Sequence, residues 1–321
     1  MTGRLGLDDV ERALAAIRPY LPPTPLRRSS ALRRAGEAYL KLECWQPTGS
    51  FKVRGATNKL VSLSTEERRR GVVAASAGNH ALGVAFAVQA LGGRTEATLF
   101  VPETAPRAKV EKLRGFKVKV HEEGATYDDA HALAMTHARR TGATYVHAFD
   151  DPRTAAGQGT VGLEILDALP SVGAILVPVG GGGLIAGVAA GVKARAPGVR
   201  IVAVQPEASP ALTESIRQGR PLLEYPAGPT LADGLAGGIG EIVFEHRDLI
   251  DDIVLVSEDE IEDAVVALLA DDQVVAEGAG AAGVAALRSG KWRADGRPAA
   301  AIVTGGNIDA SVLRRLLSAR A

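Results

Sequence analysis

The sequence has little cysteine and no long apolar run, and each shortage excludes a class of protein. Cys44 is the only cysteine in 321 residues, so no disulfide can form within the chain, and a reducing compartment is expected. No apolar run reaches the length of a membrane-spanning helix. Arg4, Asp8 and Glu11, close to the start, do not resemble a secretory signal. We therefore expect a cytoplasmic protein without a membrane partner.

Neither sign of charge is in excess. Lys and Arg together number 37, and so do Asp and Glu, so no net field attracts nucleic acid or a membrane surface. The sequence predicts no metal site, because five of the histidines lack metal-ligand spacing and are interpreted as structural. These are His121, His131, His137, His147 and His246. The length favours two domains or one elaborate α/β unit.

Short apolar runs alternate with helical patterns along most of the chain. Such alternation predicts an α/β protein with mostly parallel, doubly wound sheets. Strands are expected at 39–43, 72–76, 98–101, 117–120, 145–149, 175–179, 199–204 and 299–303. Helices are expected at 8–20, 65–70, 81–91, 106–113, 126–140, 184–195 and 258–269, and at the C-terminus. Residues 206–250 are rich in Pro and Gly and are not assigned.

Lys52 follows a Gly-Ser turn and opens a predicted helix. Ser50 is expected to cap that helix with its hydroxyl. The helix dipole then disfavours positive charge on Lys52 and lowers the pKa of its amine. A neutral lysine amine is a nucleophile that forms Schiff bases with carbonyl groups. A solvated lysine on a surface helix is the alternative that this segment alone leaves open.

Three glycine-rich or polar clusters each follow a predicted strand. Ligands of open parallel sheets bind at the carboxyl ends of the strands, so all three clusters can face one ligand. The clusters are Ser76-Ala77-Gly78-Asn79-His80, Gly180-Gly181-Gly182-Gly183 and Thr304-Gly305-Gly306-Asn307. Amides of the first cluster, with Ser76 and Asn79, would suit a carboxylate, although a plain turn at Asn79 and His80 is an equal alternative.

Gly180–Gly183 ends a strand and opens a helix, an arrangement that suits a phosphate group. No Gly-Lys-Ser/Thr follows, which excludes a Walker loop. A dinucleotide fingerprint is the serious competitor, because Gly181, Gly183 and Ala186 match it formally. That fold requires an acidic residue at the end of the next strand, and Glu207 lies two positions late. The dinucleotide-binding interpretation is therefore weakened, but it remains open.

Together these segments resemble the pyridoxal-phosphate enzymes of the tryptophan-synthase β fold, in particular the threonine/serine dehydratase and serine racemase family. The resemblance rests on four segments, in the expected order along nearly the whole chain. They are Ser50-Phe51-Lys52-Val53-Arg54-Gly55-Ala56, Ser76-Ala77-Gly78-Asn79-His80-Ala81, Val177-Pro178-Val179-Gly180-Gly181-Gly182-Gly183-Leu184 and Thr304-Gly305-Gly306-Asn307. Val53-Arg54-Gly55 after the lysine points to the dehydratase branch.

The resemblance implies pyridoxal 5'-phosphate as the cofactor and a role for each segment. Lys52 would hold the cofactor as a Schiff base and then act as the acid and base. Phe51 would pack near the ring and Asn79 would bond its hydroxyl. The glycine loop Gly180, Gly181, Gly182 and Gly183 with Leu184 would bind the phosphate, and Thr304 would face the ring nitrogen. Ser76, Ala77, Gly78, Asn79 and His80 would bind the substrate.

The implied reaction is β-elimination of L-threonine or L-serine to a 2-oxo acid and ammonia. An amino-acid racemase on the same fold is the first alternative, and a nicotinamide-dependent oxidoreductase is the more distant one. Residues 1–50 and 147–321 would form a large cofactor domain and 51–146 a small mobile domain, in a homodimer. Ala77 stands where family racemases place a Ser. Gln205 and Ala211 stand where metal-binding members have carboxylates, which supports the prediction of no metal.

Overall fold

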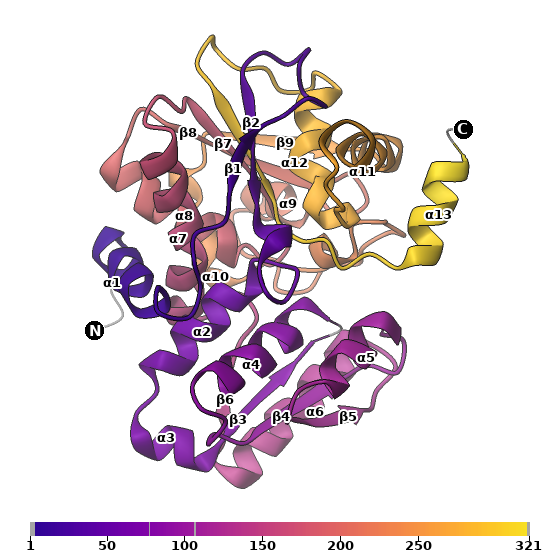
Figure 1. Cartoon of the computed structure of the whole chain (residues 1–321). Coiled ribbons are helices and arrows are strands. Elements are labelled where there is room, and N and C mark those ends of the chain that lie inside the picture. Colours follow the sequence, from indigo (N-terminus) through magenta and orange to yellow (C-terminus); the bar gives the residue numbers. More distant parts are fainter. Residues whose placement is uncertain (1–3, 77, 106, 320–321) are drawn as a thin grey trace.

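The computed structural model describes residues 4–76, 78–105 and 107–319, which form two mostly parallel sheets flanked by helices (Figure 1). The larger sheet has the order β1-β2-β10-β7-β8-β9, and only the β1–β2 pair is antiparallel. Its strands are β1 (Leu26–Arg28), β2 (Ala38–Leu42), β7 (Ala174–Pro178), β8 (Arg200–Pro206), β9 (Asp252–Val256) and β10 (Ala299–Val303). The predicted α/β class with mostly parallel sheets is confirmed.

The smaller sheet is entirely parallel, in the order β5-β4-β3-β6. Its strands are β3 (Val72–Ala75), β4 (Ala97–Val101), β5 (Lys119–Glu122) and β6 (Thr144–Tyr145). Helices α2 (Lys52–Ser62), α4 (Asn79–Ala90) and α5 (Arg107–Arg114) cover one face, and α6 (Tyr127–Thr141) covers the other. All these elements lie within the range 51–146.

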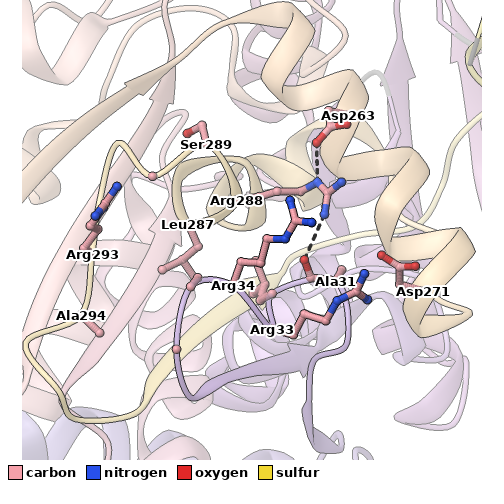
Figure 2. A pocket seen from close by; sticks show the side chains of 14 residues that line it. Ala31, Arg33, Arg34, Asp263, Asp271, Leu287, Arg288, Ser289, Arg293 and Ala294 are labelled. Atoms are coloured by element: carbon pink, nitrogen blue, oxygen red, sulfur yellow. Dashed lines mark hydrogen bonds and ion pairs between the residues drawn. The ribbon is translucent and has the colours of Figure 1, made fainter.

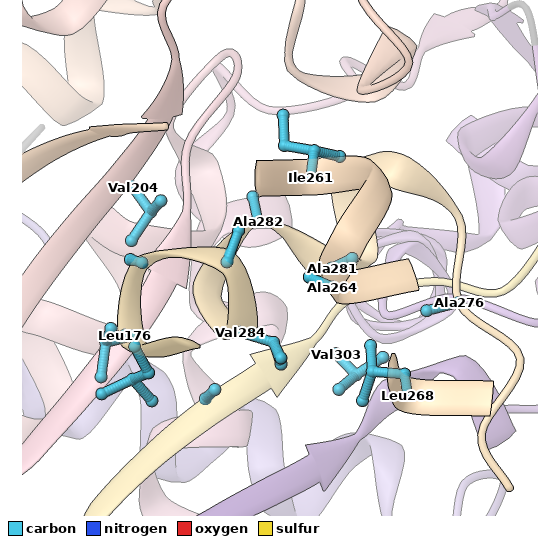
Figure 3. Packing of buried hydrophobic residues seen from close by; sticks show 14 of the residues in the cluster. Leu176, Val204, Ile261, Ala264, Leu268, Ala276, Ala281, Ala282, Val284 and Val303 are labelled. Carbon is cyan, nitrogen blue, oxygen red and sulfur yellow. The ribbon is translucent and has the colours of Figure 1, made fainter. Parts of the chain in front are cut away.

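Helices also cover both faces of the larger sheet. On one face lie α1 (Leu7–Ile17), α7 (Pro152–Ala168) and α8 (Gly183–Arg195), and on the other lie α11 (Glu258–Asp272) and α12 (Gly278–Arg288). Figure 3 shows Val284 of α12 beside Val303 of β10, within an apolar cluster that also holds Leu268 of α11. Both strand faces are therefore buried, as expected of a doubly wound sheet.

Three short helices, one terminal helix and three 3-10 turns complete the described chain. The short helices are α3 (Thr65–Arg70), α9 (Ala211–Gln218) and α10 (Glu241–Glu245), the terminal helix is α13 (Ala310–Ser318), and the turns are η1 (Glu43–Trp45), η2 (Asp233–Leu235) and η3 (Arg247–Leu249). The predicted strand at 145–149 is largely wrong, because β6 ends at Tyr145. Among the described residues no helix is long and apolar enough to cross a membrane.

A buried charge cluster anchors α2 to the larger sheet. Arg54 has no exposed surface and lies between two carboxylates. Its Nε donates to Glu43 at 2.7 Å and its Nη2 donates to Glu164 at 2.7 Å. Lys41 Nζ donates to the same Glu164 at 2.6 Å. Two cations and two anions thus compensate one another inside the protein, where an unpaired charge would be costly.

Candidate active site

A cavity of about 780 Å³ opens between the two sheets, and the three predicted clusters meet around it. Its walls come from the start of α2, the β3–α4 turn, the β7–α8 loop and the residue after β10. Every predicted site residue that the structure describes lines this cavity: Phe51, Lys52, Ser76, Gly78, Asn79, His80, Gly180, Gly181, Gly182, Gly183, Leu184 and Thr304. Ala77, also predicted, lies outside the described residues.

Lys52 is the first residue of α2, and its amine lies in the cavity. The Nζ donates to the Ala148 carbonyl at 3.0 Å and lies 5.2 Å from the centre of the Phe51 ring. Burial lowers the pKa of Lys52 to about 8, while the carboxylate of Glu277 opposes this lowering. The direction agrees with the sequence-based expectation, but its main cause is burial rather than the helix dipole.

Ser50 does not cap α2, so that prediction is wrong. The residue before the helix is Phe51, which has helical backbone angles, and no side chain caps the first turn. Ser50 instead forms an antiparallel bridge with Gly305, in the loop after β10. This bridge joins the lysine segment directly to the segment that carries Thr304, and Phe51 N donates to the Thr304 carbonyl at 3.0 Å.

The glycine loop leads directly into the first turn of α8. The N–H groups of residues 181–184 donate to no backbone carbonyl in the described part of the chain, so they are free for a ligand. Gly182 has a φ of +88°, and a Cβ on Gly181 would lie 2.3 Å from the Phe149 ring. Glycine is therefore required here, because the Phe149 ring packs directly against the loop and leaves no room for a side chain. Unpaired amides at a helix N-terminus suit a phosphate.

The β3–α4 turn supplies the predicted substrate loop. The amide of Gly78 donates to Ser76 Oγ at 3.0 Å, and a Cβ on Gly78 would lie 2.3 Å from Lys109 Cδ. His80 is buried, with its Nε2 2.8 Å from the Val146 carbonyl, and burial lowers its pKa to about 3. His80 is thus neutral and fixes the turn through its side chain.

Sequence reasoning missed the polar cluster beside Lys52. Asn79 Nδ2 donates to Glu277 Oε1 at 2.6 Å, and Asn307 Nδ2 donates to Asn79 Oδ1 at 2.8 Å. Lys109 Nζ lies 3.1 Å from Asp233 Oδ2 and 4.0 Å from Glu277 Oε2. Burial raises the pKa of Glu277. Glu277 is not among the predicted site residues, since nothing local in the sequence marks it as a pocket residue.

The dinucleotide alternative finds no support at Glu207. Its carboxylate lies 2.9 Å from Lys291 Nζ, in an exposed ion pair, and Glu207 does not line the cavity. β8 extends to Pro206, so Glu207 follows the strand directly rather than two positions late. Its carboxylate nevertheless does not line the cavity, where it would have to bind a ribose.

Among the described residues no group of three or more His, Cys, Asp or Glu side chains is arranged to hold a metal ion. Gln205 is fully buried, and its Nε2 donates to the carbonyls of Val179 at 3.5 Å and Ser209 at 3.4 Å. Its Oε1 accepts from the Thr213 amide at 3.2 Å. Carbonyl oxygens are ligands that a hard cation prefers, and here two of them accept hydrogen bonds from the Gln205 side-chain amide instead.

A second cavity, of about 710 Å³, contains none of the predicted site residues (Figure 2). Four arginines line it: Arg33, Arg34, Arg288 and Arg293. Arg288 forms an ion pair with Asp263 and donates to the Ala31 carbonyl at 3.1 Å, so it ties α12 to α11 and to the β1–β2 connection. The chemistry that the sequence predicts is confined to the first cavity.

The residues of the first cavity fit pyridoxal phosphate. A lysine with a lowered pKa, a loop of unpaired amides and a hydroxyl on Thr304 lie around one space. Residues 17–305 match the family described as "Pyridoxal-phosphate dependent enzyme". The chain belongs to that family.

Several relatives cover almost the whole chain. It is 46 % identical, over 317 residues, to an L-threonine ammonia-lyase of Thermotoga maritima, covering 97 % of this chain and 78 % of the relative. Its structure resembles maize serine racemase, with a TM-score of 0.92, 33 % identity and 99 % and 98 % of the two chains covered. It also resembles threonine deaminase isoform 2 of Solanum lycopersicum, with a TM-score of 0.88, 34 % identity and 98 % and 95 % coverage.

Proposed function

We propose that the chain is an ammonia-lyase that eliminates water from L-threonine or L-serine. The observation that carries the proposal is the meeting of the Lys52 amine, the free amides of the glycine loop and the Ser76–Asn79 turn around one cavity. The 46 % identity to an L-threonine ammonia-lyase supports the choice of reaction. The maize serine racemase, similar over nearly the whole chain, keeps racemisation as the second candidate.

Different segments of the chain have different roles in the proposed reaction. Pyridoxal phosphate, when bound, supplies the carbonyl group and the electron-accepting ring. Lys52 would hold it covalently, and the amides of Gly181 to Leu184 would hold its phosphate. Thr304 would offer the ring nitrogen a hydroxyl rather than a carboxylate, which would leave that nitrogen largely neutral. The Ser76–His80 turn binds the substrate carboxylate.

Lys52 then moves the proton that elimination requires. Its amine, uncharged above about pH 8, removes the hydrogen from the substrate Cα. The electron pair of that bond forms the Cα–Cβ double bond, and the β-hydroxyl leaves as water after it gains a proton. The enamine product takes up one water and gives a 2-oxo acid and ammonia. Substrate atoms therefore balance without an oxidant or reductant.

We also propose that residues 51–146 move as a small domain, that the protein is a cytoplasmic homodimer, and that it binds no nucleic acid. The ion pair between Lys109 and Asp233 joins the smaller sheet region to the larger one across the cavity, which suits closure over a substrate. Trp45 and Val275 are 50 % and 42 % exposed, and a second copy of the chain would cover these apolar side chains in the proposed homodimer. Light scattering after gel filtration measures the oligomeric state.

The direct test is product formation by the purified holoenzyme. L-threonine should give 2-oxobutanoate, or L-serine pyruvate, with one ammonia for each oxo acid. Lys52→Ala should lose this activity while its circular dichroism spectrum and melting temperature stay close to wild type. Absence of oxo acid from both amino acids, in protein that carries the cofactor, would contradict the proposal. Near-wild-type turnover by Lys52→Ala would remove Lys52 from the mechanism.

A further inference from the structure

The exposed edge of the active-site cavity is acidic. Asp128 at the start of α6, Glu224 before η2 and Asp233 in η2 all line it, and all three side chains are exposed. Glu277 adds a fourth carboxylate deeper in the cavity. No ion pair joins Asp128 or Glu224 to another described residue, so both charges act on whatever enters the cavity.

The cations of the cavity are already engaged. Among the described lining residues they are Lys52 and Lys109, and no arginine is present. Lys52 is the residue proposed to hold the cofactor. Lys109 is buried, with its Nζ 3.1 Å from Asp233 and 4.0 Å from Glu277. A ligand that brings one carboxylate can use the amides of the β3–α4 turn, but a second carboxylate finds no free partner.

We infer that this cavity selects amino acids with an uncharged side chain and rejects those with a second carboxylate, through Asp128 and through the Asp233 that holds Lys109. The inference rests on the proposed function and narrows its substrate class to neutral β-hydroxy amino acids. The acidic amino acid 3-hydroxyaspartate is nearly the same size as neutral 3-hydroxyasparagine. Its second carboxylate would meet the like charges of Asp128 and Asp233, and it would lose solvation without gaining an ion pair.

A pair of nearly isosteric substrates separates the effect of side-chain charge from the effect of side-chain size. The probes are L-threo-3-hydroxyaspartate and L-threo-3-hydroxyasparagine, which differ in one carboxylate and its amide. We expect the holoenzyme to show a kcat/KM for the neutral compound that exceeds the acidic one roughly tenfold or more, since several like charges act in a partly desolvated site. The gap should narrow as salt is added, because the edge carboxylates are exposed.

Two substitutions locate the source of the selection. Asp128→Asn removes one like charge, so it should reduce the ratio between the two substrates severalfold. Asp233→Asn should reduce it further, because it removes a charge and also frees Lys109 to pair with the second carboxylate. Asp8→Asn, the same change on exposed α1, is the control and should leave the ratio unchanged. The ratio cancels effects that act equally on both substrates.

Binding provides a second measurement that needs no turnover. L-asparagine and L-aspartate lack the β-hydroxyl, so calorimetry on the holoenzyme compares their affinities directly. The inference predicts that L-asparagine binds more tightly than L-aspartate, and that this preference is smaller in Asp233→Asn. Such a result supports the inference even if no oxo acid forms from serine or threonine. The absence of oxo acid would contradict only the proposed function. Equal kcat/KM values for the acidic and neutral probes, or a ratio that neither substitution changes, would overturn the inference. Rejection of 3-hydroxyasparagine as strongly as 3-hydroxyaspartate would show exclusion by size and would overturn it too.

Discussion

Asn79 and Glu277 share a hydrogen bond of 2.6 Å, although 198 positions separate them in the chain. Asn79 starts α4, which packs on the smaller sheet, and Glu277 precedes α12, which packs on the larger sheet. Asn307 adds a second bond to Asn79, from the segment after β10. Hydrogen bonds to Glu277 and from Asn307 therefore fix the orientation of the Asn79 side chain. The family resemblance implies that this side chain binds the hydroxyl of the cofactor ring.

The covalent loading of the cofactor should depend on pH through Lys52. Because burial lowers the pKa of its amine from 10.5 to about 8, the neutral and reactive form accumulates above about pH 8. The rate at which pyridoxal phosphate joins the apoprotein should rise between pH 7 and 9 and then level off, as followed by stopped-flow absorbance. A free alkylamine is the control for the pH dependence of the aldehyde itself. A rate that keeps rising toward pH 10.5 would mean an ordinary lysine.

Replacing Arg54 by methionine should destabilise the fold strongly. The change leaves the buried carboxylates of Glu43 and Glu164 without their main partner, which costs about 3 to 5 kcal/mol. Arg69→Met is the matched control, since its ion pair with Glu66 is exposed and contributes roughly 1 kcal/mol at most. Urea unfolding followed by circular dichroism measures both. Equal midpoints for the two variants would contradict the structural role of the cluster.

Racemisation should be slow relative to elimination. Racemisation needs a second acid or base on the side of the substrate opposite Lys52. The family resemblance assigns that role to the position of Ala77, whose methyl group can neither donate nor accept a proton. Chiral chromatography of a reaction with L-serine should therefore find pyruvate in large excess over D-serine. Ala77→Ser should increase the D-serine fraction. D-serine formation as fast as dehydration in the wild type would show that another group reaches that side.

Activity should not depend on a divalent cation. The buried amide of Gln205 donates to the carbonyls of Val179 and Ser209 and so occupies their oxygens. Exhaustive EDTA treatment should leave kcat/KM unchanged. In Gln205→Glu a carboxylate would face the same carbonyls, and Mg²⁺ or Ca²⁺ should then raise the melting temperature. Loss of wild-type turnover in EDTA, reversed by Mg²⁺, would contradict this prediction.

Most strands, and the helices with a clear apolar period, are predicted from the sequence, whereas β1, β9, α7, α9, α10 and α12 are not. Three glycines in α7 argue against a helix locally. In the structure they allow close helix packing, since a Cβ on Gly159 would lie 2.5 Å from the Gly187 carbonyl in α8. Similarly, α12 is rich in Gly and Ala and buried all round, so it has no amphipathic period to detect.

The site was predictable to the extent that it follows strand ends. Lys52, the glycine loop and Thr304 each adjoin a recognisable turn, and parallel topology brings such turns together. Lys109 and Asp233 were not predictable, because their role depends on how the two sheet regions face each other. The same reason explains the error at Ser50, whose bridge to Gly305 replaces a local cap.

Borohydride reduction of the purified protein tests the central claim most directly. The account predicts a yellow protein whose absorption band is bleached by the reductant, and a pyridoxyl group found by peptide mass spectrometry on Lys52. Lys52→Ala, prepared in parallel, should carry no such group. A colourless protein that gains no band from added pyridoxal phosphate, or a label on Lys109 or another lysine in place of Lys52, would contradict it.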